Sequence, residues 1–198
     1  MKLLHVSDWH LGCVLRNVSR QPDHETVLSE IAEIARTQRP DLIVHTGDLF
    51  DQARPSYETL QFGIESLQEL AAIAPTVVLA GNHDSAALFQ LFQRLAGSGS
   101  RLRFVDRAQP PDAGGILEFP AGAERIRLAP LPFVHQNRMI DAFEDPGTWM
   151  ASYADRIQHI EEALTRGLQE GYDAQRDVLL FAAHLHVGGA VFSNSERS

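Results

Sequence analysis

The chain has 198 residues, of which 44% are hydrophobic and 22% are charged, a composition that excludes disordered, collagen-like and coiled-coil proteins. Its apolar runs are too short for a membrane span, its first residues are too weakly apolar for a signal peptide, and its one cysteine cannot form an internal disulfide. We therefore expect one domain, in the cytoplasm and not in a membrane. The net charge of −9 gives no general attraction for nucleic acid, and nine histidines in an acidic chain make metal binding the first possibility to test.

Apolar strands alternate with amphipathic helices in the first half of the chain. Strands are predicted at 2–6, 42–45 and 76–80, and helices at 23–39, 56–73 and 86–95. Crossovers of helical length between consecutive strands imply parallel pairing, so the expected fold is a layered α/β domain.

The second half of the chain has a different texture. Short strand candidates between 101 and 131 are broken by Gly and Pro and predict antiparallel pairing. A helix is then predicted at 148–171, followed by a buried strand at 178–182. No repeat or linker divides the chain.

Metal-binding side chains follow four of these strands. The motifs are Asp8-x-His10, Gly47-Asp48-x-x-Asp51, Gly81-Asn82-His83-Asp84 and His184. Because the carboxyl ends of parallel strands share one edge of a sheet, these side chains should converge there. Oxygen and imidazole ligands suit Mn²⁺, Fe²⁺ or Zn²⁺, and two such ions about 3.5–4 Å apart form a site for phosphoryl chemistry. Each motif alone is typical of a turn, but turn chemistry does not explain why successive strands all end in ligands.

Together these motifs resemble those of the calcineurin-like metallophosphoesterases, and in particular the SbcD-type nuclease subunits of DNA repair. Residues 7–12, 47–51, 80–85 and 130–133 carry the closer likeness. The resemblance implies an α/β/β/α sandwich, with a parallel first half, and a metallophosphoesterase (nuclease) domain over residues 1–198.

The resemblance also implies roles for individual residues. Two divalent ions, expected to be Mn²⁺, would be held by Asp8 and His10 at the first site, Asn82 and His184 at the second, and Asp48 between them. His83 would stabilise the transition state or protonate the leaving oxygen, and Asp51 would orient the His83 ring.

Other candidates near these motifs are weaker. Arg16 and Arg20 follow the first motif and could contact a DNA phosphate, although solvated surface arginines are the more frequent case. Cys13 could be a ligand for a softer metal but is expected to be a small apolar filler. His45 is expected in the core and His24 to have no function.

The final Gly-His-x-His ligand motif of the family has no counterpart after His184. Either the chain is a fragment of a longer protein, which we favour, or His184 and His186 serve as the final pair in a reduced domain. In the first case, the cap and the partner-binding helices are also absent. The sequence of 192–198 is typical of a loop cut in mid-course.

Three functions remain open. The first is a Mn²⁺-dependent DNA exo- and endonuclease subunit that works in repair with an SbcC-like ATPase, which would supply much of the DNA affinity. This subunit could form a homodimer through the helices at 56–73 or 86–95. The second is a phosphodiesterase or phosphatase acting on small phosphoesters, which the acidic charge favours. The third is an inactive fragment with an incomplete metal site.

Overall fold

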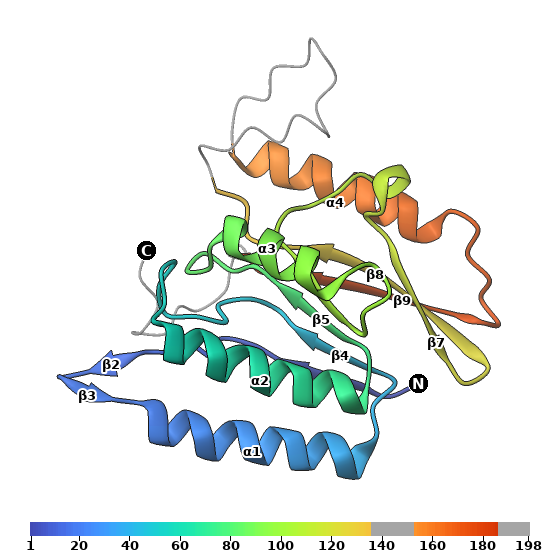
Figure 1. Ribbon diagram of the computed structural model, residues 1–198. Coiled ribbons are helices and arrows are strands. Elements are labelled where there is room, and N and C mark those ends of the chain that lie inside the picture. The colour runs from blue at the N-terminus through green and yellow to red at the C-terminus, as the bar shows by residue number, and fades with distance from the viewer. Residues whose placement is uncertain (136–152, 186–198) are drawn as a thin grey trace.

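The computed structural model describes residues 1–135 and 153–185, and its first layer is a parallel sheet (Figure 1). The sheet has the order β1-β4-β5-β6, with all neighbours parallel. Its strands are β1 (Leu3–Val6), β4 (Leu42–His45), β5 (Thr76–Leu79) and β6 (Leu102–Val105). Every residue of the central strands β4 and β5 is buried, as expected for short apolar strands that are covered on both faces.

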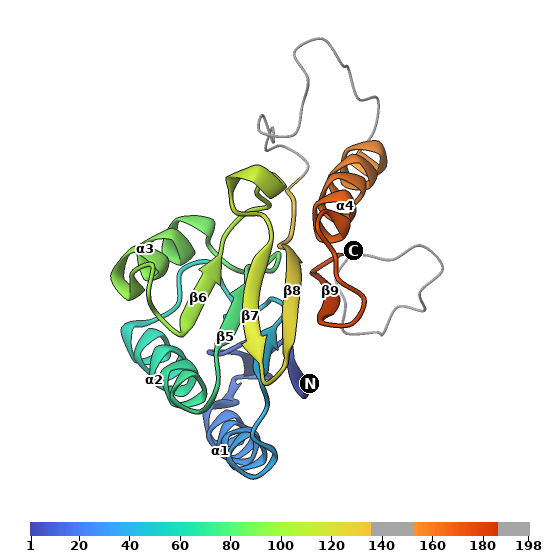
Figure 2. The same ribbon diagram turned by 90° about the vertical axis from the view of Figure 1, so that its right-hand side faces the viewer.

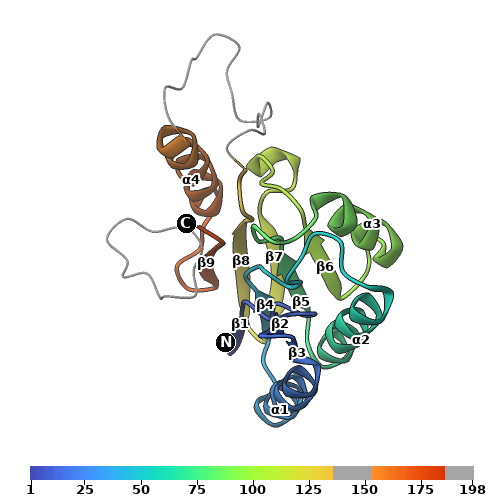
Figure 3. The same cartoon turned by 90° about the vertical axis from the view of Figure 1, so that its left-hand side faces the viewer.

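Three helices cover one face of this sheet, as Figure 2 and Figure 3 show. They are α1 (Gln21–Gln38), α2 (Tyr57–Ile73) and α3 (Ala86–Ala96). Ser56 and Ser85 cap α2 and α3 by accepting a backbone N–H three residues further on. Each helix buries side chains in the same core, for example Leu28 from α1, Leu67 from α2 and Phe89 from α3.

The second layer is a three-stranded sheet made of β7 (Leu117–Ala121), β8 (Glu124–Leu131) and β9 (Asp177–Ala183). β7 is antiparallel to β8, whereas β9 is parallel to β8. Helix α4 (Tyr153–Gln169) lies on its outer face (Figure 2). Between the two sheets, strand residues such as Val44 and Val77 pack with Ile126 and Leu128. The α/β/β/α arrangement implied by the family resemblance is therefore confirmed.

Three details differ from the expectation or add to it. β6 is the fourth strand of the parallel sheet, so antiparallel pairing in the 101–131 region is restricted to β7 and β8. β9 belongs to the second sheet and not to the first. A hairpin of β2 (Val14–Leu15) and β3 (Val18–Ser19), which the sequence analysis did not predict, precedes α1.

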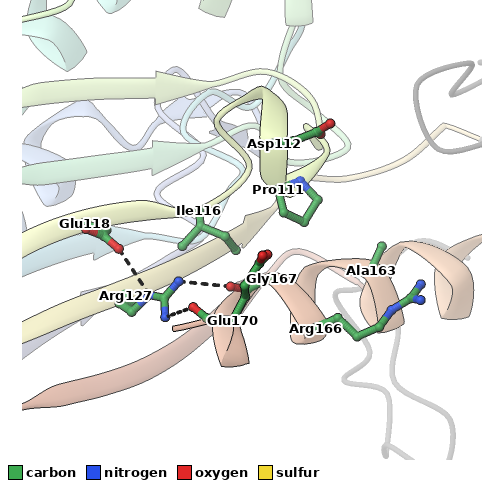
Figure 4. Close-up of a pocket in the computed structure, with 9 residues that line it drawn as sticks. All are labelled: Pro111, Asp112, Ile116, Glu118, Arg127, Ala163, Arg166, Gly167 and Glu170. Carbon is green, nitrogen blue, oxygen red and sulfur yellow. Dashed lines mark hydrogen bonds and ion pairs between the residues drawn. The ribbon is translucent and has the colours of Figure 1, made fainter. Parts of the chain in front are cut away.

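A cavity of about 760 Å³ lies between α4, β8 and the 3-10 turn η1 (Pro111–Ala113), as Figure 4 shows. The buried Arg127 donates to the carbonyl oxygens of Glu170 and Gly167 at 2.6 and 3.1 Å, and its Nε lies 3.2 Å from a Glu118 carboxylate oxygen. Arg127 therefore joins the second sheet to the C-terminal end of α4. None of the strand-end residues named above lines this cavity.

Across the described ranges, 1–135 and 153–185, no helix is both long enough and apolar enough to cross a membrane.

Candidate metal centre

The loops that leave β1 and β4 run side by side beyond the ends of the strands. The backbone N–H of Asp8 donates to the carbonyl oxygen of Gly47, that of His10 to Asp48 and that of Leu11 to Leu49, each at 3.0 Å. The pairing of the two strands is thus continued by their loops, which brings Asp8 and His10 next to Asp48.

The backbone of this region is unusual because three non-glycine residues have positive φ. The angles are 55° at Asp8, 46° at His10 and 54° at Asp48. Left-handed backbone at a residue with a side chain costs on the order of 1 kcal/mol or more and concentrates at functional sites. Here it directs two carboxylates and an imidazole to the same edge of the sheet.

Gly47 and Gly81 allow neighbouring groups to approach these loops closely. Gly47 has a φ of +119°, and a Cβ atom there would lie 2.3 Å from Nδ1 of His184. A Cβ atom on Gly81 would lie 2.1 Å from Oδ1 of Asp48. Both distances are far below van der Waals contact, so the site needs glycine at both positions.

Asp48 lies at the centre of the site and is only 4% exposed. Its Oδ1 accepts the backbone N–H of His83 at 2.9 Å. Its Oδ2 lies 3.6 Å from Nε2 of His10 and 3.6 Å from Nε2 of His184. One oxygen is therefore anchored by the protein, while the other faces two imidazoles from different strands, as a shared ligand requires.

Two groups of side chains have their ligand atoms close enough to hold a metal ion. One consists of His10, Asp48 and His83, and the other of Asp8, Asp48 and His184, each within 4.8 Å. Asp48 is common to both groups. The expected pairing placed Asp8 with His10; here Asp8 is grouped with His184 and His10 with His83, and Oδ1 of Asp8 also lies 3.9 Å from Nε2 of His10. Carboxylate and imidazole donors suit divalent transition metals, so this donor set fits two such ions.

The hydrogen bonds of His184 orient its ring so that Nε2 can act as a metal ligand. Its Nδ1 lies 2.8 Å from the carbonyl oxygen of Thr46, which only accepts, so Nδ1 carries the ring proton. Its Nε2 therefore has a lone pair, and it lies 2.9 Å from Oδ1 of Asn82, a second acceptor. With the amide oriented as in the structure, these two acceptors face each other, as two ligands of one metal ion would.

Asp51 contacts both neighbouring histidines, but through different groups. Its backbone carbonyl oxygen accepts the Nδ1 proton of His83 at 2.8 Å, which leaves the lone pair of His83 on Nε2. Its carboxylate instead lies 3.6 Å from Nδ1 of His10, a buried atom with no hydrogen bond among the described residues. The predicted contact between Asp51 and His83 is thus made by the main chain of Asp51.

The weaker candidates lie around the edge of the site. Arg16 is at the exposed turn of the β2–β3 hairpin, and Arg20 pairs with Asp23 in the first turn of α1. Cys13 lies beside Asp51, and burial, together with the nearby carboxylate, raises the pKa of its thiol, which stays protonated at neutral pH. His186 lies outside the described residues.

His45 and Asp84 have important places that the sequence analysis did not assign. His45 is in the core, as expected, but its Nδ1 also accepts the backbone N–H of Gly47 at 3.3 Å. Complete burial lowers its pKa to about 3, with the charge of His184 contributing in the same direction. Asp84 is 5% exposed, and burial raises the pKa of its carboxyl. Its position at the end of the Gly-Asn-His-Asp motif was the feature of the sequence that could have identified Asp84 as part of the site.

The fold and the paired donor groups define the protein as a metallophosphoesterase by architecture. The calcineurin-like phosphoesterase family matches residues 1–188, and the chain belongs to that family.

Its curated relatives include proteins named as the SbcD component of the nuclease SbcCD. The Escherichia coli K12 protein is 31% identical over 210 residues, the Bacillus subtilis protein 30% over 203 and the Staphylococcus saprophyticus protein 28% over 201. Each comparison covers 100% of this chain but only 49% or 50% of the relative. The chain thus spans about half the length of these relatives.

Proposed function

We propose that this chain is the phosphodiesterase domain of a metal-dependent DNA exo- and endonuclease subunit. The observation that carries the proposal is that the carboxylate of Asp48 is shared by the two ligand groups. The relatives named as nuclease components favour DNA as the substrate. We further propose that it acts in the cytoplasm, in DNA end processing and repair, with an SbcC-like ATPase that supplies the DNA affinity that a chain of charge −9 lacks.

Two Mn²⁺ ions would be held by five side chains, one of them the bridging carboxylate. The proposed ligands are Asp8, His10, Asp48, Asn82 and His184. When bound, the ions would polarise a phosphoryl oxygen and supply a nucleophilic water at neutral pH. The carboxylate of Asp51 would orient His10 and increase the basicity of its Nε2, as carboxylates that contact metal-binding histidines commonly do.

His83 is the proposed acid that protonates the leaving oxygen. Its Nδ1–H donates to the carbonyl oxygen of Asp51, so Nε2 is the atom at which a proton can be exchanged. The ring of His83 lies edge-to-face with His10, with the centroids 4.8 Å apart, which holds it at the metal centre. A positioned acid of this kind contributes about 10²–10⁴-fold to a rate.

The first experiment compares hydrolysis of linear duplex DNA and of bis(p-nitrophenyl) phosphate with Mn²⁺. We expect cleavage of both, loss of both in Asp8→Asn, and a fall of about 10²–10⁴-fold in His83→Gln without loss of Mn²⁺ binding. His159→Gln, on α4, is the control histidine and should behave as the wild type. Wild-type activity in Asp8→Asn or His83→Gln would refute the role given to that residue.

A second candidate function is the hydrolysis of small phosphoesters. The net charge of −9 favours it, because this charge repels the many phosphates of a DNA backbone. Turnover of the small ester with no DNA cleavage, also in the presence of an added ATPase partner, would support this alternative.

We also propose that the subunit forms a homodimer through α2 and α3. Tyr57 on α2 and Leu91 and Leu95 on α3 are 88%, 50% and 76% exposed, and a partner subunit would cover these apolar side chains. Sedimentation equilibrium tests this assembly. A monomer at micromolar concentration, unchanged by Leu95→Glu, would contradict it.

A further inference from the structure

Asp84 joins the two loops that carry the central ligands. Its Oδ1 accepts the backbone N–H of Phe50 at 3.0 Å, and its Oδ2 accepts those of Leu49 and Gly81 at 3.1 and 2.9 Å. Leu49 and Phe50 directly follow Asp48 in the chain, and Gly81 directly precedes Asn82. The Asp84 carboxylate thus links the loop after β4 to the loop after β5, in addition to the bond from the His83 N–H to Asp48.

Several backbone N–H groups of the loop around Asp48 depend on side-chain acceptors. Its φ of +54° interrupts the strand geometry, so the following N–H groups find no partner in the sheet. Asp84 accepts two of them, and His45 accepts the N–H of Gly47 before the loop. Each buried N–H left without a partner would cost about 1–3 kcal/mol. A strained ligand residue keeps its conformation only where its surroundings fix it, and Asp84 provides the acceptors for the two N–H groups that directly follow Asp48.

The position of Asp84 excludes a direct role in binding an ion. Both of its oxygens are occupied by backbone donors, it is 5% exposed, and it belongs to neither ligand group. Its influence on an ion must therefore pass through Asp48 and Asn82.

We propose that Asp84 is a positioning residue that sets the affinity of the metal centre by holding these two loops together. The inference rests on the proposed metal-dependent function. Partners that orient a metal ligand typically account for about 10–100-fold in metal affinity, which is the effect expected here.

The experiment titrates the metal-free protein with Mn²⁺ by calorimetry and compares Asp84→Asn with the wild type. The asparagine has the same shape, but its amide group turns a donor toward a backbone donor, which forces the loops apart. We expect Mn²⁺ affinity to fall about 10–100-fold.

Asp177→Asn is the matched control, because Asp177 is another buried carboxylate, 7% exposed, that accepts a backbone N–H from Asp173 and pairs with Arg125. It begins β9, whereas His184 follows the end of that strand, roughly 23 Å away at the rise of an extended chain. Urea unfolding with EDTA should show both variants destabilised, yet Asp177→Asn should bind Mn²⁺ within about twofold of the wild type.

Asp84→Glu separates position from charge. It keeps the negative charge and both acceptor oxygens but moves them by one methylene, about 1.5 Å, so the affinity should again fall at least about tenfold. Wild-type affinity in both Asp84 variants, an equal loss in Asp177→Asn, or failure of only the Asp84 variants to fold would each overturn the inference. Absence of Mn²⁺ binding by the wild-type protein would instead overturn the proposed metal centre.

Discussion

Replacement of Gly81 by alanine is the most direct test of the geometry of the centre. The new Cβ atom would lie 2.1 Å from Oδ1 and 2.3 Å from the backbone nitrogen of Asp48. A rotamer change can move the oxygen but not the nitrogen, so one of the two loops must shift. Restoring a Cβ contact of 3.0–3.4 Å, which is itself tight, requires a movement of about 1 Å.

That movement should affect metal binding more than stability. Overpacking of this kind costs about 1–3 kcal/mol, partly offset by the roughly 0.4–1 kcal/mol that alanine gains over glycine through the unfolded chain. Metal–ligand distances, in contrast, vary by only about 0.2 Å between functional sites. We therefore expect Gly81→Ala to fold, to lose about 1–2 kcal/mol of unfolding free energy, and to bind Mn²⁺ at least tenfold more weakly.

Gly99→Ala is the control, because Gly99 has no positive φ and its Cβ atom would meet no atom within 4 Å. It should bind Mn²⁺ as the wild type does, with an unfolding free energy within about 1 kcal/mol of it. Calorimetric Mn²⁺ titration and urea unfolding measure the two quantities. Wild-type Mn²⁺ affinity in Gly81→Ala would refute the close approach of the β5 loop to Asp48.

Three further outcomes follow from the same contacts. First, because the pKa of His45 is about 3 in the folded protein and near 6.5 in the unfolded chain, only the unfolded chain takes up this proton as the pH falls below 6.5. The unfolding free energy should therefore decrease by up to about 1.4 kcal/mol per pH unit between about pH 6.5 and 4, and urea unfolding of His45→Phe should show a smaller slope. Second, Arg127→Met should cost about 1–3 kcal/mol in the same assay, because the carbonyl oxygens of Gly167 and Glu170, at and just after the end of α4, lose their donor, and an unchanged stability would contradict that capping role. Third, Mn²⁺ at a hundredfold excess over its dissociation constant should stabilise the protein by about 2.7 kcal/mol per site relative to EDTA, whereas Asp48→Asn should show little of this gain in thermal unfolding.

The sequence predicted the first sheet well because the strands β4 and β5 are buried on both faces, and therefore have continuous apolar sequences. β6 was placed wrongly among the antiparallel strands for a physical reason. It is the edge strand of the parallel sheet, and its residues Leu102–Val105 alternate between buried and partly buried, which is the pattern of an antiparallel strand.

The residues of the candidate site were predicted from the strand ends, but their pairing could not be. A one-dimensional pattern does not state whether Asp51 meets His83 through its carboxylate or through its carbonyl oxygen. Nor does it reveal that Asp84 receives three backbone N–H groups from two loops, since two of those donors are more than thirty positions away in the chain. Both facts depend on the course of the loops in space.

His184 comes from the second sheet, and this links metal binding to the packing of the two sheets. Asp8, His10, Asp48 and Asn82 all follow strands of the first sheet, whereas His184 follows β9 of the second. Its Nδ1 donates to Thr46 at the end of β4, so its ring reaches Asp48 only while the sheets stay in contact. An ion that binds Asp48 and His184 together would therefore hold both layers of the sandwich. Because binding free energy adds to folding free energy for a site that exists only in the folded state, the second sheet should gain stability from an ion bound at the edge of the first.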